Sequence, residues 1–244
     1  MIFPYILVFI FGLAAGSFIN SVTLRYNTGE KVTRGRSRCF NCAKNLRWFE
    51  LIPLLSFLFL RGRCRSCRSK ISWQYPAVEI LTGILFLLVS IKWSSGDHYE
   101  IGILAYWLIV CSILIAIAVY DARHKIIPDS FAYSLLAVSL AGNLIFFKIN
   151  LVGLALSIAP ALFLASLWYF SGGRWMGLGD AKLMSGGGVF LGFPSAIWAM
   201  VLSFWAGAAV GISLLLSNSG VTLKSEIPFG PFLVLGILLA FFYV

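Results

Sequence analysis

The sequence predicts an all-α polytopic membrane protein with about eight transmembrane helices and a small zinc-knuckle loop domain between the first two. Composition is the first reason, because 60% of the residues are hydrophobic and only 11% are charged, unlike ordinary soluble domains. Long apolar runs are the second, because crossing the hydrocarbon core takes about 20 apolar residues. Backbone groups in lipid must be paired within the segment, so each run is expected to be a helix.

Eight apolar runs are the expected spans. In chain order they are Ile2–Leu24, Pro76–Ile91, Ile101–Tyr120, Ile126–Phe147, Leu151–Phe170, Ala181–Phe193, Ala196–Leu216 and Pro228–Tyr243. The first lacks a basic n-region and a small-residue cleavage site, so we expect a retained span. The sixth is short and contains Ser185-Gly186-Gly187-Gly188, where each glycine costs roughly 1 kcal/mol against alanine. We attribute this glycine run to tight helix packing.

The charge distribution predicts three domains and an orientation. We expect a first helix over 1–24, a basic loop over 25–73 and a seven-helix membrane domain over 74–244. Twelve of the 19 basic residues lie in the loop, against only Glu30 and Glu50. The positive-inside rule therefore predicts a cytoplasmic loop and an N-terminus outside. The net charge of +10 then indicates contact with anionic membrane lipid, and not a nucleic-acid partner.

Four cysteines in this loop form a candidate metal site. Cys39 and Cys42 make one CxxC pair, Cys64 and Cys67 make another, and 21 residues separate the pairs. This spacing is typical of a closed, structural Zn²⁺ site, in which all four coordination positions are filled and none is left for water. Disulfides are the rival interpretation, but cytoplasmic thiols stay reduced; redox pairs remain an alternative. Bound metal would supply folding energy that so small a loop lacks.

Asp121 and Asp180 are the candidate catalytic residues. Each lies at the edge of an apolar run, and the predicted topology puts both at the cytoplasmic face. A carboxylate near hydrocarbon costs at least ~2.5–3.5 kcal/mol, which makes it a functional candidate. Two such groups close together share one proton, so one can activate water while the other polarises a carbonyl, as in an aspartyl protease.

Two alternatives compete with catalysis by this pair. Aspartate is favourable at helix N-termini, so the residues could instead be caps at the membrane interface; for Asp129, capping or positioning is the preferred interpretation. Intramembrane carboxylates also serve as proton relays in multi-span transporters. A relay is expected to have its charges near mid-bilayer and a repeated arrangement of broken helices, and neither is evident here.

The aspartates lie within motifs that resemble those of type IV prepilin peptidases, membrane aspartyl proteases of the GxGD kind. The main matches are Asp121 followed by Ile126-Ile127-Pro128-Asp129, and Gly177-Leu178-Gly179-Asp180-Ala181-Lys182-Leu183. Four further islands resemble the family: Gly16 to Val22, Glu50 to Phe57, Tyr75 to Glu79, and Ile227 to Phe232. The resemblance implies that Asp121 and Asp180 are the catalytic pair. It also implies that the substrate is the short basic leader of type IV prepilins or type II secretion pseudopilins, cut at the cytoplasmic face of the bacterial inner membrane.

The same resemblance implies a second activity. Prepilin peptidases with this cysteine loop commonly N-methylate the new amino terminus with S-adenosylmethionine. The sequence contains no Gly-rich adenosyl-cofactor fingerprint. Glu79 and Asn20, two polar residues in apolar surroundings, are our candidates for methyl transfer. The alternative for both is a hydrogen bond between helices.

Overall fold

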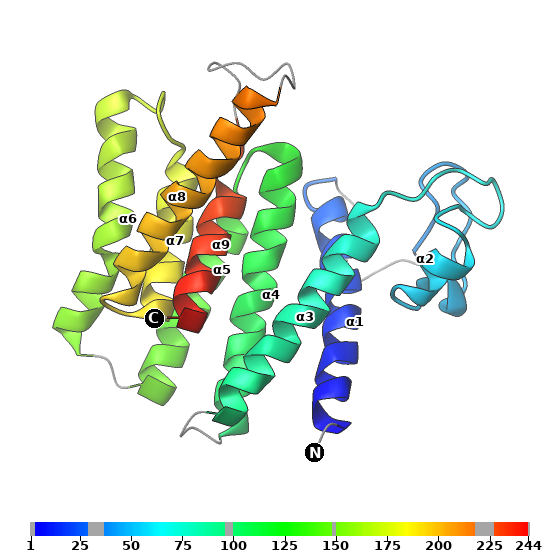
Figure 1. The fold of residues 1–244 in the computed structure, drawn as a ribbon, viewed down its shortest axis with the longest axis horizontal. Helices are drawn as coiled ribbons and strands as arrows, with labels where there is room; N and C mark the ends of the chain where they lie inside the picture. Colours follow the sequence, from blue (N-terminus) through cyan, green and yellow to red (C-terminus); the bar gives the residue numbers. More distant parts are fainter. Residues whose placement is uncertain (1–2, 29–36, 96–99, 148–149, 218–226, 244) are drawn as a thin grey trace. The chain divides into compact units, whose positions relative to one another are not determined.

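The computed structural model describes residues 3–28, 37–95, 100–147, 150–217 and 227–243, and helices dominate these ranges (Figure 1). The helices are α1 (Phe3–Arg25), the 3₁₀ helix η1 (Trp48–Leu51), α2 (Leu55–Phe59), α3 (Gln74–Ser95), α4 (Ile101–His124), α5 (Asp129–Gly142), the π-helical η2 (Asn143–Phe147), α6 (Leu151–Ser171), α7 (Leu178–Leu191), α8 (Ser195–Leu216) and α9 (Gly230–Tyr243). Within the described ranges, β structure is limited to two isolated bridges. The all-α prediction is confirmed.

Among the described residues, six helices are long and apolar enough to cross a membrane: α1, α3, α4, α5 with η2, α6 and α8. The expected sixth and eighth spans correspond to α7 and α9, which have 14 residues each. At 1.5 Å per residue such a helix is about 21 Å long, shorter than the hydrocarbon core. A membrane protein is therefore confirmed, whereas the number of eight full spans stays a prediction.

Two expected helix boundaries differ from the structure. Helix α4 continues to His124, so Asp121 lies in its last turn and does not follow the helix. The fourth apolar run was expected to start at Ile126, but α5 begins at Asp129. Proline explains the shift: Pro128 has no N–H, its ψ of 130° is extended, and it disfavours helical backbone at the residue before it.

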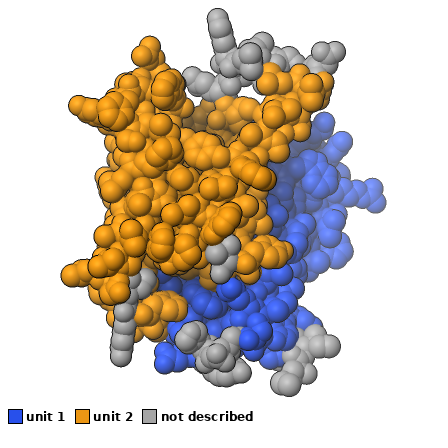
Figure 2. All heavy atoms as spheres, turned by 60° about the vertical axis from the view of Figure 1, so that its left-hand side comes forward, with its two compact units in different colours: residues 1–116 blue, residues 117–244 orange. Residues whose placement is uncertain are grey.

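Contacts divide the chain into two compact units, residues 1–116 and 117–244 (Figure 2). In the first unit, α1 packs along α3. A Cβ atom on Gly12 would lie 2.8 Å from the Cα of Gly83, and one on Gly16 would lie 2.7 Å from the Cα of Glu79. The two backbones therefore approach closely at a small-residue stripe. The predicted domain boundaries after residues 24 and 73 stay predictions.

In the second unit, α7 packs against four helices, α5, α6, α8 and α9. Its glycine run remains helical and is fully buried. A Cβ on Gly186, Gly187 or Gly188 would collide, in that order, with Leu135 of α5, Ile237 of α9 and the Ser157 carbonyl of α6. Each glycine thus allows a different neighbouring helix to approach α7 closely. This confirms that the run serves tight packing.

Candidate functional site

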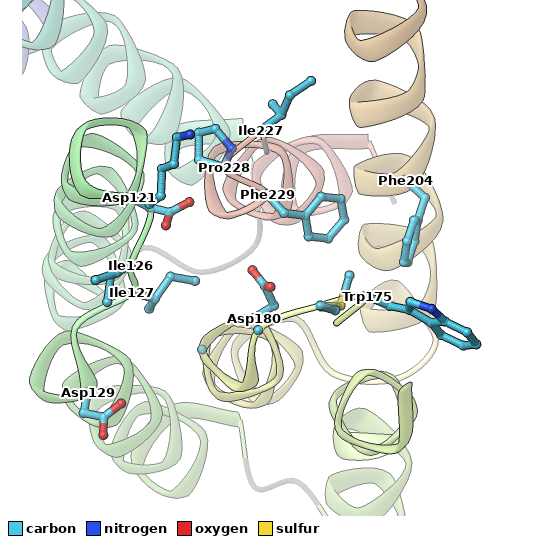
Figure 3. A pocket seen from close by; sticks show the side chains of 14 residues that line it. Asp121, Ile126, Ile127, Asp129, Trp175, Asp180, Phe204, Ile227, Pro228 and Phe229 are labelled. Carbon is cyan, nitrogen blue, oxygen red and sulfur yellow. The ribbon is translucent and has the colours of Figure 1, made fainter. Parts of the chain in front are cut away.

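A cavity of about 670 Å³ opens in the second unit (Figure 3). Its walls come from the end of α4 and the turn after it, the start of α5, the start of α7 and the residues just before it, the segment that leads into α9, and α8. Asp121, Asp129, Asp180 and Lys125 are its charged residues. Its remaining lining is largely apolar, with Ile127, Trp175, Phe204 and Phe229 among the larger side chains. The cavity therefore combines acidic groups with an apolar wall.

Asp121 is held at one side of this cavity by backbone contacts. Its side chain is buried, with 4% of its surface exposed, and the backbone N–H of Gly230 donates to its Oδ2 at 2.9 Å. A Cβ on Gly230 would lie 2.6 Å from the same oxygen, so a larger residue would displace the carboxylate. The chain reverses just after Asp121, at Lys125 with φ of 55°, whose N–H closes the last turn of α4 on the Asp121 carbonyl.

Asp180 enters the cavity from the first turn of α7. It is 8% exposed and follows Gly177, the N-cap residue, by three positions. A Cβ on Gly179 would lie 3.0 Å from the Cβ of Ile127, so this glycine allows the start of α7 to approach the turn after α4. A carboxylate in the first helical turn is also favoured by the helix dipole.

The carboxyl groups of Asp121 and Asp180 point toward the same space inside the cavity (Figure 3), and their charges interact. Both side chains are buried, so water screens their repulsion poorly. Ionisation of one of these buried carboxyl groups therefore disfavours ionisation of the other. The cavity therefore contains two groups of the kind that serve as base and acid in general acid–base catalysis.

Asp129 lines the same cavity but points away from the pair (Figure 3). Its Oδ1 forms an ion pair with Lys182 Nζ at 2.7 Å, and its side chain is 60% exposed. The Lys182 ammonium also lies 5.5 Å from the centre of the Tyr133 ring. Asp129 lies in the first turn of α5, and its ion pair connects α5 with α7. This contact agrees with a positioning role.

The four cysteines of the basic loop converge in the first unit. Their sulfur atoms all lie within 4.8 Å of one another, so the cluster can bind a metal ion. Four sulfur donors suit a tetrahedral Zn²⁺ site. The Ser69 hydroxyl lies 3.1 Å from Cys67 Sγ, and hydrogen bonds from the Ser69 side chain, the Ser69 backbone and the Asn41 side chain lower the pKa of the Cys67 thiol to about 5. The loop thereby favours the thiolate of Cys67, and the thiolate is the form that ligates metals.

The two CxxC segments have the same backbone path. Cys39 N–H donates to the Lys44 carbonyl at 3.0 Å, and Cys64 N–H donates to the Ser69 carbonyl at 2.9 Å. Residues with left-handed backbone follow the first cysteine of each pair by four positions. They are Ala43, with φ of 54°, and Arg68, with φ of 58°. Each segment is a tight turn that presents two sulfurs to the same point.

Asn20 and Glu79 are both buried in the first unit, 1% and 6% exposed. Asn20 Nδ2 donates to the Tyr75 carbonyl at 3.2 Å, and Glu79 Oε2 accepts from the Leu54 N–H at 2.9 Å. Asn20 therefore connects α1 with α3, as its alternative interpretation expected, and Glu79 binds both the loop backbone and the Ser17 side chain of α1. The Asn20 Oδ1 atom is buried and has no hydrogen-bond partner within the described ranges.

The contact of Gly230 with Asp121 was not predicted from the sequence. Its hydrogen bond to Asp121 joins positions 109 residues apart, and such a long-range pairing has no local sequence pattern. A usable signal was nevertheless present in Phe229-Gly230-Pro231. A glycine followed by proline at the start of an apolar run marks a helix start, where N–H groups lack partners in the helix.

Comparisons with known proteins identify the family of the chain. Residues 10–93 match the Bacterial Peptidase A24 N-terminal domain, and residues 108–212 match the Type IV leader peptidase family.

Three relatives, each named prepilin leader peptidase/N-methyltransferase, are similar to this chain over most of its length. The Myxococcus xanthus protein is 34% identical over 226 residues, covering 91% of this chain and 66% of the relative. The Legionella pneumophila protein is 32% identical over 271 residues, covering 99% and 92%, and the Bacillus subtilis protein is 34% identical over 242 residues, covering 97% and 93%. No solved structure matches the chain significantly. The chain belongs to the type IV leader peptidase family.

Proposed function

We propose that this protein is an integral inner-membrane aspartyl endopeptidase that removes the short basic leader of type IV prepilins or type II secretion pseudopilins, and that it also N-methylates the new amino terminus. The observation that carries the peptidase activity is the pair Asp121 and Asp180, two buried carboxyl groups in one cavity. Family membership and the names of the relatives support both activities.

The pair supplies the chemistry of peptide hydrolysis. The ionised carboxylate accepts a proton from water, whose oxygen attacks the scissile carbonyl. The protonated carboxyl group donates its proton to the carbonyl oxygen, which stabilises the tetrahedral intermediate. The apolar wall, which includes Ile127 and Phe229, excludes bulk water and so strengthens both interactions.

The position of the pair suits a substrate anchored in the membrane. Asp121 is in the last turn of α4 and Asp180 in the first turn of α7, so both belong to helix ends and not to helix centres. A precursor with an apolar helix in the bilayer and a basic leader in the cytoplasm presents its scissile bond at that depth. We propose that this end faces the cytoplasm, as the basic loop does, and that the N-terminus is outside.

A proton-relay transporter is not supported. Relay carboxylates are expected along a path through the bilayer, whereas Asp121 and Asp180 meet at helix ends in one cavity. The matched families are also peptidases over most of the chain.

The decisive test of cleavage uses the purified protein in detergent with a prepilin peptide that contains the leader junction. Asp121→Asn and Asp180→Asn should each lower kcat by at least about a thousandfold, because acid and base act as a unit. Glu100→Gln, an exposed carboxylate outside the cavity, is the control and should cleave like the wild type. Retained cleavage by either aspartate variant would remove that residue from the pair.

We propose that the cysteine cluster holds Zn²⁺ with a structural role. All four sulfurs belong to one group within 4.8 Å, so a tetrahedral ion would have no open position for water. Metal analysis of the purified protein should find about one zinc per chain. A folded and active preparation free of metal would contradict the structural role.

We further propose that the loop contacts anionic lipid. Trp48, Phe59 and Trp73 are 77%, 84% and 77% exposed, in a segment rich in arginine and lysine. Large aromatic side chains beside basic residues are typical of surfaces at the membrane interface.

For methyl transfer we propose Glu79 and Asn20 as site residues, with S-adenosylmethionine supplying the methyl group. Two observations fit a polar ligand: the Asn20 Oδ1 atom is buried without a partner in the described ranges, and the Glu79 carboxylate is buried a short way along the same helix pair. A buried anion favours a cationic ligand such as a sulfonium or an ammonium group. The Glu79 carboxylate can also accept a proton from the new amine.

Mass spectrometry of the cleaved peptide tests this proposal. With S-adenosylmethionine present, the wild type should add one methyl group, and Glu79→Gln should lower methylation at least about tenfold while cleavage continues. Glu50→Gln, whose carboxylate accepts the Arg47 N–H within the loop, is the matched control. Unchanged methylation by Glu79→Gln would exclude that residue.

A further inference from the structure

The first turn of α9 presents one backbone donor to Asp121. Gly230 is the first residue of α9, and Pro231 follows it and has no N–H. The next N–H, of Phe232, is already paired with the Phe229 carbonyl at 3.0 Å. The Gly230 N–H is instead bonded to Asp121 Oδ2 at 2.9 Å. The sequence Gly-Pro at this point therefore directs one donor to one carboxylate.

The absence of a side chain at Gly230 is part of the same contact. A Cβ there would lie 2.6 Å from Asp121 Oδ2 and 3.1 Å from Asp121 Cβ. Both values are below ordinary van der Waals separation. Because Asp121 Cβ is attached directly to the backbone of α4, the aspartate cannot avoid the clash by a small rotation of its end. Glycine is thus required for the carboxylate to reach the N–H.

This contact separates the two aspartates electrostatically. A backbone N–H that donates to a carboxylate favours its ionised form, and the start of a helix adds the positive end of its dipole. Asp180 also lies in a first helical turn, that of its own helix α7, so dipoles alone do not distinguish the two. The backbone of Gly177 also interacts with the Asp180 carboxyl group, but among the hydrogen bonds of the described residues the direct donor at 2.9 Å belongs to Asp121.

We propose that Gly230 is a positioning residue that holds Asp121 as the ionised base and leaves the shared proton on Asp180. This inference rests on the proposed peptidase activity. In the first step the water oxygen bonds to the scissile carbon, Asp121 takes the water proton, and Asp180 gives its proton to the carbonyl oxygen. In the second step the C–N bond breaks, Asp121 returns its proton to the leaving nitrogen, and one hydroxyl of the intermediate returns a proton to Asp180. Both carboxyl groups regain their starting states.

The other charged groups at the cavity are Lys125, in the turn after α4, and Asp129, at the start of α5. Asp129 is already paired with Lys182 of α7. The described parts of α8 and α9 contribute no charged side chain to the lining. A substitution at Gly230 leaves all of these groups in place, so their effects cancel in a comparison with the wild type.

The first test is the pH profile of kcat/KM for Gly230→Ala. Because the added Cβ pushes Asp121 away from its donor, the base should ionise at higher pH, and the acid limb should move up by about one pH unit or more. At neutral pH, kcat should fall at least about tenfold. Gly211→Ala is the matched control, because a Cβ on Gly211 of α8 meets nothing within 4 Å. An unchanged acid limb together with kcat within threefold of the wild type would overturn the proposal.

A second measurement does not need cleavage. In an Asp180→Asn background, Asp121 titrates without its partner carboxyl, and its protonated form is followed by the infrared carbonyl band. Adding Gly230→Ala should raise the midpoint of this titration by about one pH unit. An unchanged or lower midpoint would overturn the proposal, including when the variant has lost its native packing. If the wild type cleaves no prepilin but the midpoint rises, the proposed function fails while the contact between Gly230 and Asp121 stands.

Discussion

Replacing the glycines of α7 one at a time should give a graded loss of stability that depends on what each glycine faces. A Cβ on Gly186 would lie 2.8 Å from Leu135 Cγ and 2.9 Å from the Leu136 backbone nitrogen. A Cβ on Gly188 would meet the Ser157 carbonyl, and one on Gly187 would meet the tip of the Ile237 side chain. Backbone cannot move aside cheaply, whereas a side-chain tip can rotate.

The expected magnitudes follow from two opposing effects. Forcing a methyl group into a packed site costs about 1–3 kcal/mol, and replacing glycine by alanine in a helix returns up to about 1 kcal/mol. Gly188→Ala and Gly186→Ala should therefore lower the free energy of unfolding by about 1–2 kcal/mol, and Gly187→Ala by about 0–1 kcal/mol. Gly211→Ala, which adds its Cβ to open space, should be neutral or stabilising.

Thermal unfolding in a single detergent measures this series. For a chain of this size each kcal/mol corresponds to about 2–4 °C in Tm, so Gly188→Ala and Gly211→Ala should differ by several degrees. If Gly188→Ala and Gly211→Ala have the same Tm, then close backbone approach does not fix the position of α7. An order in which Gly187→Ala is the least stable would show that Ile237 cannot rotate away.

Three further predictions concern the loop and the rim of the cavity. Cys42→Ser should lower the zinc content, measured by metal analysis, by at least about tenfold. Acid should also release zinc from the wild type, because protonated thiols do not ligate metal. Zinc that remains bound after both changes would show that the metal site lies elsewhere. Lys182→Met should change the free energy of unfolding by less than about 1 kcal/mol, because its partner Asp129 is 60% exposed and exposed ion pairs contribute little. A larger loss of stability, measured by unfolding in detergent, would mean that the pair is more desolvated than its exposure indicates. Trp48→Phe should reduce the quenching of tryptophan fluorescence by brominated anionic lipid in reconstituted vesicles, and equal quenching would show that this part of the loop does not reach the bilayer.

Sequence patterns predicted the helices well where a single physical requirement governs them. Crossing lipid demands long apolar runs, so α1, α3, α4 and α6 appear close to their expected ranges. The start of α5 was misplaced because hydropathy ignores proline geometry at Pro128. The lengths of α7 and α9 were harder to anticipate, because a short buried helix and a full span have similar composition.

The candidate site was predictable as a list of residues but not as an arrangement. Buried carboxylates are costly, which singled out Asp121 and Asp180, and the cysteine spacing singled out the metal cluster that the structure brings together. Their neighbours were not predictable in the same way. Gly230 contributes an N–H group that every residue except proline has, so its importance comes only from the long-range packing that brings α9 to the end of α4.

The repeated backbone path of the two cysteine turns has a consequence for how this protein can vary in length. Cys39 and Cys42 lie in one hydrogen-bonded turn, and Cys64 and Cys67 lie in the other. Lengthening the connection between them adds only about 0.6 kcal/mol of closure entropy for each doubling. One residue inserted inside either turn would instead misdirect a sulfur. The connection is therefore the permissive site for insertions and reporter peptides, provided that the Leu54 contact with Glu79 is kept.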